Sequence, residues 1–320
     1  MIFYYYKNTW GGGFTNQFVF LIDHLIAMER KHTKEFCIVF LDVFKNHYTD
    51  NENLSSFSEI IDISWLNNVV FKNIFIIDLY KIQTELRFGW IVNNDYIELN
   101  PEYLLHLVKY NKSIFEIEPI TNDPSYRNKK PFWLSIPSKK IYYQQWEELC
   151  GRLMNITVSN MNGKGIDIMY DNDYKHIFRY MSFIPSIHLY NTPSFLNYQY
   201  RNVIHIRNED DALTVWNEND DMITKKYIKK IKEIILPTND TINIILTARK
   251  YNNPIIEWMK QNNYIIYIPF YYNLEKQRER MAILDLQMST QFGNNIFIGF
   301  KKSSFSQLLS IRFTGISELL

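Results

Sequence analysis

The fold is decided by residues 202–246, which read NVIHIRNEDDALTVWNENDDMITKKYIKKIKEIILPTNDTINIIL. The stretch opens with a segment at residues 202–207 whose apolar residues are Val203, Ile204 and Ile206, and it closes with the largely apolar residues 242–246, and we expect a buried strand at each. Between them, residues 222–235 carry apolar side chains at helical spacing. A strand, a helix and a second strand in this order predict a parallel crossover unit.

The same alternation continues toward the end of the chain. It predicts a helix over residues 254–262, a strand over 264–269, a helix over 274–290, a strand over 296–300 and a helix over 304–313. Four strand–helix pairs in succession specify a doubly wound parallel sheet. The loops that follow its strands meet at one edge, where such sheets bind nucleotides or sugar nucleotides.

The first forty residues have the same order of elements. We expect a strand at residues 2–6, a glycine-rich turn, an amphipathic helix at residues 16–30 and a buried strand at residues 37–43. The middle of the chain is less periodic, with a strand expected at 71–79, part of a helix at 141–150 and a turn at 163–165. Pro193 lies in an aperiodic segment, so we predict two lobes, residues 1–195 and 196–320.

The composition indicates a compact globular protein without a polynucleotide or membrane partner. Of the 320 residues, 46% are hydrophobic and 22% charged, and 35 basic residues against 34 acidic ones give a net charge of +1. Residues 225–230 hold four lysines, which we interpret as the solvated face of a helix. No signal peptide or membrane anchor is evident, which favours a cytoplasmic protein. Two cysteines exclude a disulfide framework.

Residues 11–17, GGGFTNQ, form the first candidate site, at the turn between the first strand and its helix. Three glycines allow a backbone to approach a ligand closely, and Asn16 and Gln17 offer amides to hydroxyls or a phosphate. The stretch lacks the GxxxxGK pattern of a P-loop. A simple turn with a capping Thr or Asn explains it equally well.

The second candidate site is the strand end at residues 205–208, His-Ile-Arg-Asn. Strand alternation would point His205 and Arg207 to the same face, and an arginine at the carboxyl edge of a sheet can clamp a phosphate with two N–H groups. A structural ion pair between Arg207 and a following acidic residue is the alternative. Those acids are also the candidates for a catalytic base: Glu209, Asp210 and Asp211.

The third candidate site is the strand end and helix start at residues 299–306, GFKKSSFS. The amides of Ser304 and Phe305, the hydroxyls of Ser303 and Ser304 and the positive end of the helix dipole would together bind an anion without a metal. Alternatively, Ser303 caps the helix and does nothing more.

These segments together resemble the GDP-fucose-dependent fucosyltransferases, that is, the protein O-fucosyltransferases and the α1,2- and α1,6-fucosyltransferases. GGGFTNQ is similar to the family's G-G-x-x-N-Q turn, residues 57–62 (FSEIID) to its F-x-D-I-F-D segment, and HIRNED to its H-x-R-R-x-D motif. The late run of the family, D-x-x-x then F-x-G then S-S-x-S, is matched by residues 283–286, 297–299 and 303–306.

The resemblance implies a GT-B fold, with two Rossmann-like lobes whose parallel sheets face a central cleft. It implies an inverting transferase that takes GDP-fucose or a related sugar nucleotide and modifies a glycan or a protein hydroxyl, without a metal or other cofactor. Arg207 and Asn16 would be the catalytic residues, with Arg207 on the leaving β-phosphate and Asn16 toward the reacting sugar. The donor would be bound by Gly12, Gly13, Phe14, His205, Arg207, Asp285, Ser303, Ser304 and Phe305.

One departure from the family pattern keeps other functions open. Asn208 stands where the second Arg of H-x-R-R-x-D is expected, although Asp210 keeps its place. A non-catalytic protein that binds a glycan or nucleotide sugar, or a transferase with a different sugar nucleotide, therefore remains an alternative. Asp171 and Asp173 form a D-x-D pattern by which other glycosyltransferases hold a divalent cation, but no buried strand precedes it, which disfavours a metal site.

Overall fold

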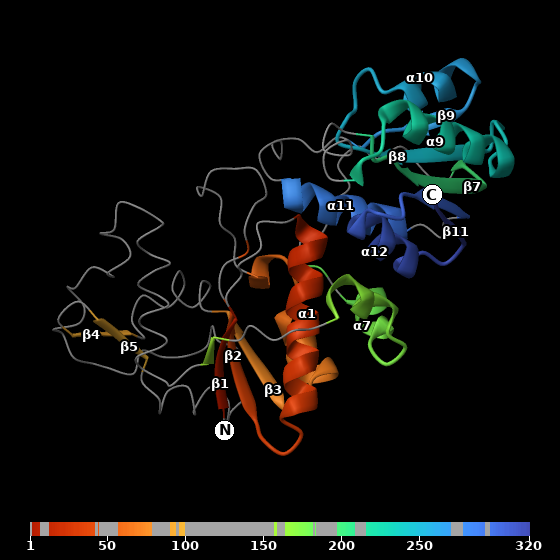
Figure 1. Ribbon diagram of the computed structural model, residues 1–320. Helices are drawn as coiled ribbons and strands as arrows, with labels where there is room; N and C mark the ends of the chain where they lie inside the picture. Colours follow the sequence, from red (N-terminus) through yellow and green to blue (C-terminus); the bar gives the residue numbers. More distant parts are fainter. Residues whose placement is uncertain are drawn as a thin grey trace. The chain divides into compact units, whose positions relative to one another are not determined.

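The computed structural model of the chain is an α/β protein with two separate parallel sheets (Figure 1). It divides into two compact units: residues 1–12 with 20–164, and residues 13–19 with 165–320. The residues that the structure describes are 2–6, 13–41, 44, 57–78, 90–93, 96–99, 157–158, 164–181, 183, 197–208, 216–269, 278–291 and 295–320.

The N-terminal unit holds a four-stranded sheet in the order β3-β2-β1-β6, and every pair of neighbours is parallel. Its strands are β1 (Ile2–Tyr6), β2 (Cys37–Leu41), β3 (Ile74–Asp78) and β6 (Thr157–Val158). The helix α1 (Phe14–Lys31) connects β1 to β2 and runs alongside these strands in Figure 1. Because α1 buries Leu21, Leu25 and Met28 completely, its apolar side is the core side that the sequence predicted.

The other described elements of this unit are short. Asp62 caps the one-turn helix α2 by accepting a hydrogen bond from the Trp65 amide at 3.0 Å. Residues 57–62, which resemble a family segment, are thus part of a capped turn. The elements are η1 (Phe57–Glu59), α2 (Ile63–Trp65), η2 (Leu66–Val70) and the antiparallel strands β4 (Trp90–Asn93) and β5 (Tyr96–Leu99). The expected helix at 141–150 lies outside the described residues.

The C-terminal unit is a five-stranded parallel sheet in the order β11-β10-β7-β8-β9. All four predicted strand–helix pairs are confirmed, and a fifth strand, β11, was not predicted. The elements are β7 (Tyr200–His205), α9 (Asp220–Ile234), β8 (Thr241–Leu246), α10 (Pro254–Gln261), β9 (Ile265–Tyr267), α11 (Arg278–Gln291), β10 (Ile296–Gly299), α12 (Ser304–Arg312) and β11 (Ile316–Leu319).

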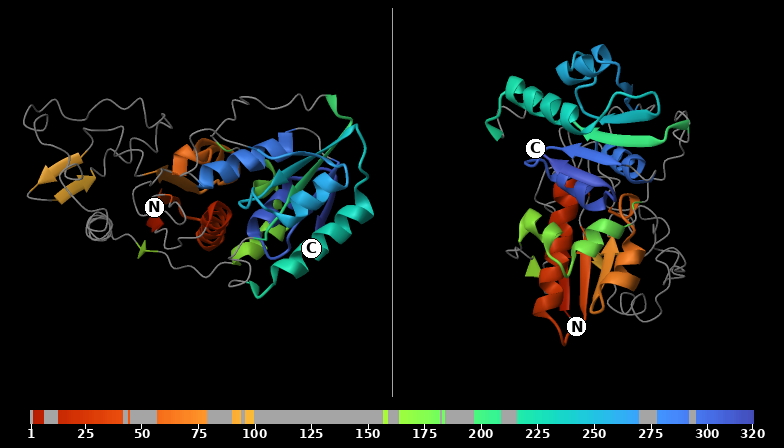
Figure 2. Two further views of the ribbon diagram at one scale, coloured as in Figure 1. Left: turned by 90° about the horizontal axis from the view of Figure 1, so that it is seen from above. Right: turned by 90° about the vertical axis from the view of Figure 1, so that its right-hand side faces the viewer.

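Helices cover both faces of this sheet (Figures 1 and 2). On one face Ile204 and Ile298 pack with α9 and α10 in a cluster that includes the fully buried Tyr227. On the other face the Phe297 ring lies 5.7 Å from the ring of Phe313, which follows α12. Parallel strands buried on both faces need apolar residues at nearly every position, which is why they read as continuous apolar runs in the sequence.

The two units divide at residues 164 and 165, whereas the sequence predicted a junction near residue 195. The reason is that η5 (Gly165–Tyr170) and α7 (Lys175–Tyr180) pack against the C-terminal unit. Arg312 on α12 donates hydrogen bonds to the carbonyls of Phe178 and Met181 at 3.1 and 3.0 Å. Burial lowers the pKa of Arg312 to about 10.

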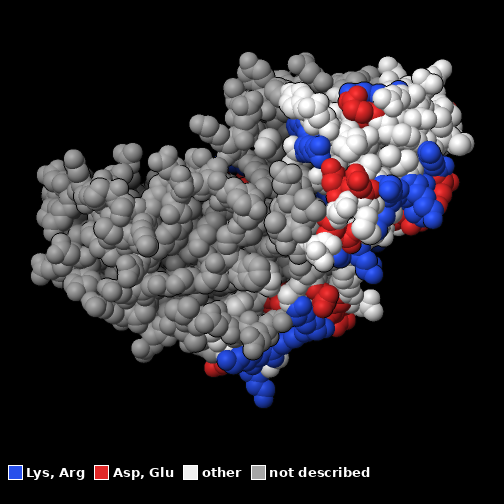
Figure 3. All heavy atoms as spheres, turned by 45° about the horizontal axis from the view of Figure 1, so that its top comes forward, with Lys and Arg blue, Asp and Glu red and all other residues white. Residues whose placement is uncertain are grey.

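Charged side chains of both signs share the described surface. On the face drawn in Figure 3, basic and acidic groups lie next to one another instead of forming one basic patch. On α9, Lys230 lies 3.1 Å from Glu233, while Lys229 is 81% exposed, as expected for a solvated lysine face. Among the described residues no helix has both the length and the apolar character required to span a bilayer.

Candidate functional site

The strand order of the C-terminal sheet has one switch point. Counted along the chain, its strands lie in the order fifth, fourth, first, second, third, so the direction of winding reverses between β7 and β10. Ligands of open α/β sheets bind at such a switch point, outside the carboxyl ends of the two strands. The segments that follow β7 and β10 here are the second and third candidate sites of the sequence analysis.

His205 ends β7 and is buried at this edge, with 5% of its surface exposed. Its Nδ1 lies 2.6 Å from the Ser306 hydroxyl, and its ring meets the Phe305 ring edge-on at 5.0 Å between centroids. Ser306 Oγ also accepts a hydrogen bond from the Phe300 amide at 2.9 Å, so its own hydrogen can go to Nδ1. Burial, and second the charge of Arg207, hold the pKa of His205 well below its usual 6.5. The imidazole is therefore neutral.

Arg207 lies two residues beyond, where β7 has already ended. Its guanidinium carbon stands 4.9 Å from the centre of the Trp216 ring, and this ring packs against Phe300 at 5.2 Å. Phe300 belongs to the core face of α9 and α10, whereas His205 contacts α12. Alternation continues through Ile206, which lies in the same core cluster as Ile204, and then ends, because Arg207 contacts the Trp216 ring that packs against this cluster. The predicted common direction of His205 and Arg207 is therefore corrected.

Ser303 precedes α12 as its N-cap, and its Oγ accepts a hydrogen bond from the Ser306 amide at 3.4 Å. The capping role that the sequence offered as an alternative is thus present. It leaves the amides of Ser304 and Phe305 as first-turn donors for which the helix itself supplies no acceptor. The side chains of Ser304 and Phe305 are half-buried, and Phe305 contacts His205. A helix start of this kind favours a bound anion.

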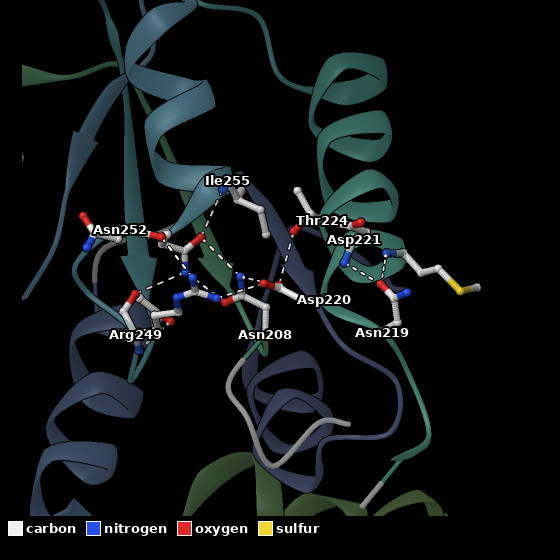
Figure 4. Close-up of polar contacts among 11 residues, drawn as sticks. Asn208, Asn219, Asp220, Asp221, Thr224, Arg249, Asn252 and Ile255 are labelled. Carbon is white, nitrogen blue, oxygen red and sulfur yellow. Dashed lines mark hydrogen bonds and ion pairs between the residues drawn. The ribbon is translucent and has the colours of Figure 1, made fainter. Parts of the chain in front are cut away.

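Asn208, which replaces the expected second arginine, is buried in a polar network between three segments (Figure 4). Its Nδ2 donates to Asp220 at 3.2 Å, and its Oδ1 accepts from Asn253 Nδ2 at 2.9 Å. Asn253 is the N-cap of α10 and accepts from the Ile255 amide. Arg249 pairs with Asp220 at 2.9 Å and closes the network. The side chain at position 208 therefore joins the end of β7 to the starts of α9 and α10.

The first candidate site falls at the start of α1. Gly13 accepts hydrogen bonds from the Asn16 and Gln17 amides, as a capping residue does. Phe14 is 2% exposed and packs with Phe18 and Phe183, so its side chain belongs to the core. Asn16 Oδ1 is buried and has no hydrogen-bond partner among the described residues, which is uncommon for a buried amide oxygen. Gly12 lies outside the described residues.

Asp285 lies half-buried on α11, and its charge raises the pKa of Tyr267 on β9, after the larger effect of burial. Asp171 accepts a hydrogen bond from the Asp173 amide at 3.0 Å within the turn that precedes α7, so the D-x-D pattern forms a local turn. In the described part of the chain no three His, Cys, Asp or Glu side chains come together as a metal site would require. Glu209, Asp210 and Asp211 lie outside the described residues.

The comparisons with known proteins return solved structures only. No family model matches the sequence, and no curated protein does. The chain is similar to a crystal structure of the NodZ α-1,6-fucosyltransferase soaked with GDP-fucose, with 11% identity, a TM-score of 0.44 and coverage of 98% of this chain and 92% of that one. It is also similar to a structure of the fucosyltransferase NodZ from Bradyrhizobium, with 10% identity, a TM-score of 0.40 and coverage of 96% and 91%.

Sequence reasoning missed several residues that build the site. Trp216 supports Arg207, yet it lies in a stretch without periodicity, where a lone tryptophan carries no signal. Ser306 was noted only as part of a motif, although it joins His205 to Phe300. Asn253 directly precedes the Pro254 that starts α10, and an Asn before a Pro is a recognisable N-cap signal.

Proposed function

We propose that the chain is an inverting, metal-independent glycosyltransferase that transfers fucose from GDP-fucose to a hydroxyl of a glycan or a protein. One observation carries the proposal: Arg207 and the start of α12 flank the switch point of a parallel sheet. Arginine side chains and the free amides of a helix's first turn commonly bind phosphate groups, and together they suit a diphosphate. The family resemblance of the sequence supports the identity of the donor.

The chemistry of the transfer explains these groups. Inversion proceeds through an oxocarbenium-like transition state, in which negative charge accumulates on the departing diphosphate. Fixed donors stabilise that charge where it develops, with no reorganisation during the reaction. In the proposal Arg207 neutralises the β-phosphate, the amides of Ser304 and Phe305 hold the pyrophosphate, and the Asn16 amide serves the reacting sugar. His205 and Asp285 serve the nucleoside, and the base comes from the acids after Arg207.

A second candidate is a protein that binds a nucleotide sugar or a glycan without turning it over. The observation that favours it is the position of Asn208, which is 2% exposed and committed to Asp220 and Asn253. Its amide carries no charge and is committed to this network, so position 208 supplies no second cation to the donor in place of the family's arginine. Hydrolysis of the donor in the absence of an acceptor would favour the enzyme, and tight binding without hydrolysis or transfer would favour the binding protein.

The test is a calorimetric titration with GDP, GDP-fucose, GDP-mannose and UDP-sugars in the presence of EDTA. We expect GDP-selective binding by the wild type and a large loss of affinity in Arg207→Ala. The matched control is Arg201→Ala, which removes the same side chain from the amino-terminal half of β7. Preference for UDP-sugars, a requirement for manganese, or equal losses in the two variants would contradict the proposal.

A further inference from the structure

We infer that Trp216 is a positioning residue, which holds the guanidinium of Arg207 in place for the diphosphate; this inference rests on the proposed function. The guanidinium carbon lies 4.9 Å from the centre of the Trp216 ring, within the range of a cation–π contact. Stacking occupies the face of a guanidinium, whereas its N–H donors point outward in its plane. The contact thus orients the arginine through its face and leaves the N–H edge of the guanidinium outside the contact.

The Trp216 ring is itself fixed from the other side of the switch point. It packs on Phe300, the residue that follows β10, at 5.2 Å between ring centres. Lys302, in the turn between β10 and α12, donates a hydrogen bond from Nζ to the Trp216 carbonyl at 3.0 Å. The segment that follows β7 is therefore tied to the turn that leads into the amides of Ser304 and Phe305.

Glu218 strengthens this tether. Its side chain is 13% exposed and lies between two lysines, 3.1 Å from Lys302 Nζ and 3.0 Å from Lys226 Nζ on α9. Hydrogen bonds from Lys226 and Lys302 lower the pKa of Glu218, which keeps it charged. One carboxylate thus links α9, the segment before it and the turn before α12. Trp216 and Glu218 together hold the arginine half and the amide half of the site in one arrangement.

An arginine that is held in this way loses less side-chain freedom when the ligand binds, because part of the ordering has already occurred. A long side chain that is free to rotate otherwise loses conformational entropy when a ligand immobilises it. Removal of the tryptophan ring should therefore weaken diphosphate binding, and it should do so through Arg207. This dependence separates a positioning role from a general effect on folding.

The experiment is a double-mutant cycle with Trp216→Leu, Arg207→Ala and the double variant, titrated with GDP-fucose and with inorganic pyrophosphate. We expect Trp216→Leu to weaken the binding of both ligands about two- to twelvefold, because the ligand must then order the Arg207 side chain by itself. In the Arg207→Ala background the same change should have little further effect. Trp216→Phe, which keeps an aromatic face, should recover most of the affinity. Trp216→Met, which also removes the ring, replaces the leucine variant if that variant does not fold.

The matched control is Trp258→Leu. Trp258 lies on α10, and its ring also contacts a cation, with Lys232 Nζ 5.2 Å from the ring centre. It should leave the affinity for both ligands unchanged. Wild-type affinity in Trp216→Leu, or the same loss with and without Arg207, would overturn the inference. If the wild type binds neither ligand, the proposed function fails. The Arg207–Trp216 contact is then tested by measuring the free energy of unfolding of the same three variants. If the losses of the two single variants add up to the loss of the double variant, the contact is refuted.

Discussion

The replacement Gly299→Ala tests how tightly β10 packs against α12. A Cβ at position 299 would lie 2.7 Å from Cζ and 2.9 Å from Cε1 of the Phe297 ring, and 2.9 Å from Ser306 Cβ. Phe297 and Ser306 are both fully buried, so neither can move aside without disturbing the core. Overpacking of this kind costs about 1–3 kcal/mol of unfolding free energy.

The expected loss converts to a measurable change in unfolding temperature. At about 2–4 °C per kcal/mol for a domain of this size, Gly299→Ala should unfold about 2–12 °C below the wild type in a calorimetric scan. Since Ser306 holds His205 and the start of α12, the variant should also bind GDP-fucose more weakly. Gly13→Ala is the control, because no heavy atom lies within 4 Å of its added Cβ, and it should lose no more than about 1 kcal/mol as a poorer N-cap. Equal unfolding temperatures for Gly299→Ala and the wild type would refute the reasoning.

Three further predictions follow from individual side chains. Because the pKa of His205 is lowered in the folded state, the unfolded chain binds more protons below pH 6.5, and the free energy of unfolding should fall by up to about 1.4 kcal/mol per pH unit as the pH drops below 6.5. Denaturation curves of His205→Gln between pH 5 and 7 should lack this slope. An unchanged slope would exclude His205 as its source. Arg312→Met leaves the carbonyls of Phe178 and Met181 without their donor and should lower the free energy of unfolding by about 3 kcal/mol or more. Proteolysis should then appear within residues 165–181, and Arg312→Lys should lose less stability. A stable, protease-resistant Arg312→Met would contradict this prediction. Asn208→Arg should lower the free energy of unfolding by about 3–5 kcal/mol without improving the affinity for GDP, because it places a charge inside the hydrogen-bonded network of Asp220 and Asn253. A variant that binds GDP more tightly would show that position 208 faces the donor.

The C-terminal sheet could be predicted because its strands and helices carry their structure in local patterns. The strand β8, for example, is buried at all six positions, and α9 places Ile223, Tyr227 and Ile231 on one buried side. By contrast, β11 is a short, half-exposed strand at the edge of the sheet, and its residues Ile316–Leu319 gain their structure only by pairing with β10. Such an edge strand has no local signal that distinguishes it from a tail.

The unit boundary could not be predicted because it depends on contacts between distant residues. The segment of η5 and α7 has little periodicity, and Arg312, which holds it, lies more than 130 residues further along the chain. The direction of Arg207 was missed for a similar reason, since it depends on where β7 ends and on Trp216. Motifs thus identified which residues reach the switch point, but their neighbours decide how they are oriented there.

Amide hydrogen exchange of the full chain with and without GDP-fucose, in EDTA, tests the central claim most directly, because it requires no variant to fold. The account predicts that the donor slows exchange at residues 206–208 and 303–306, where the segments after β7 and β10 would enclose the diphosphate. Slower exchange elsewhere with no change in these two segments, or slower exchange at residues 171–173 that appears only when manganese replaces the EDTA, would contradict it.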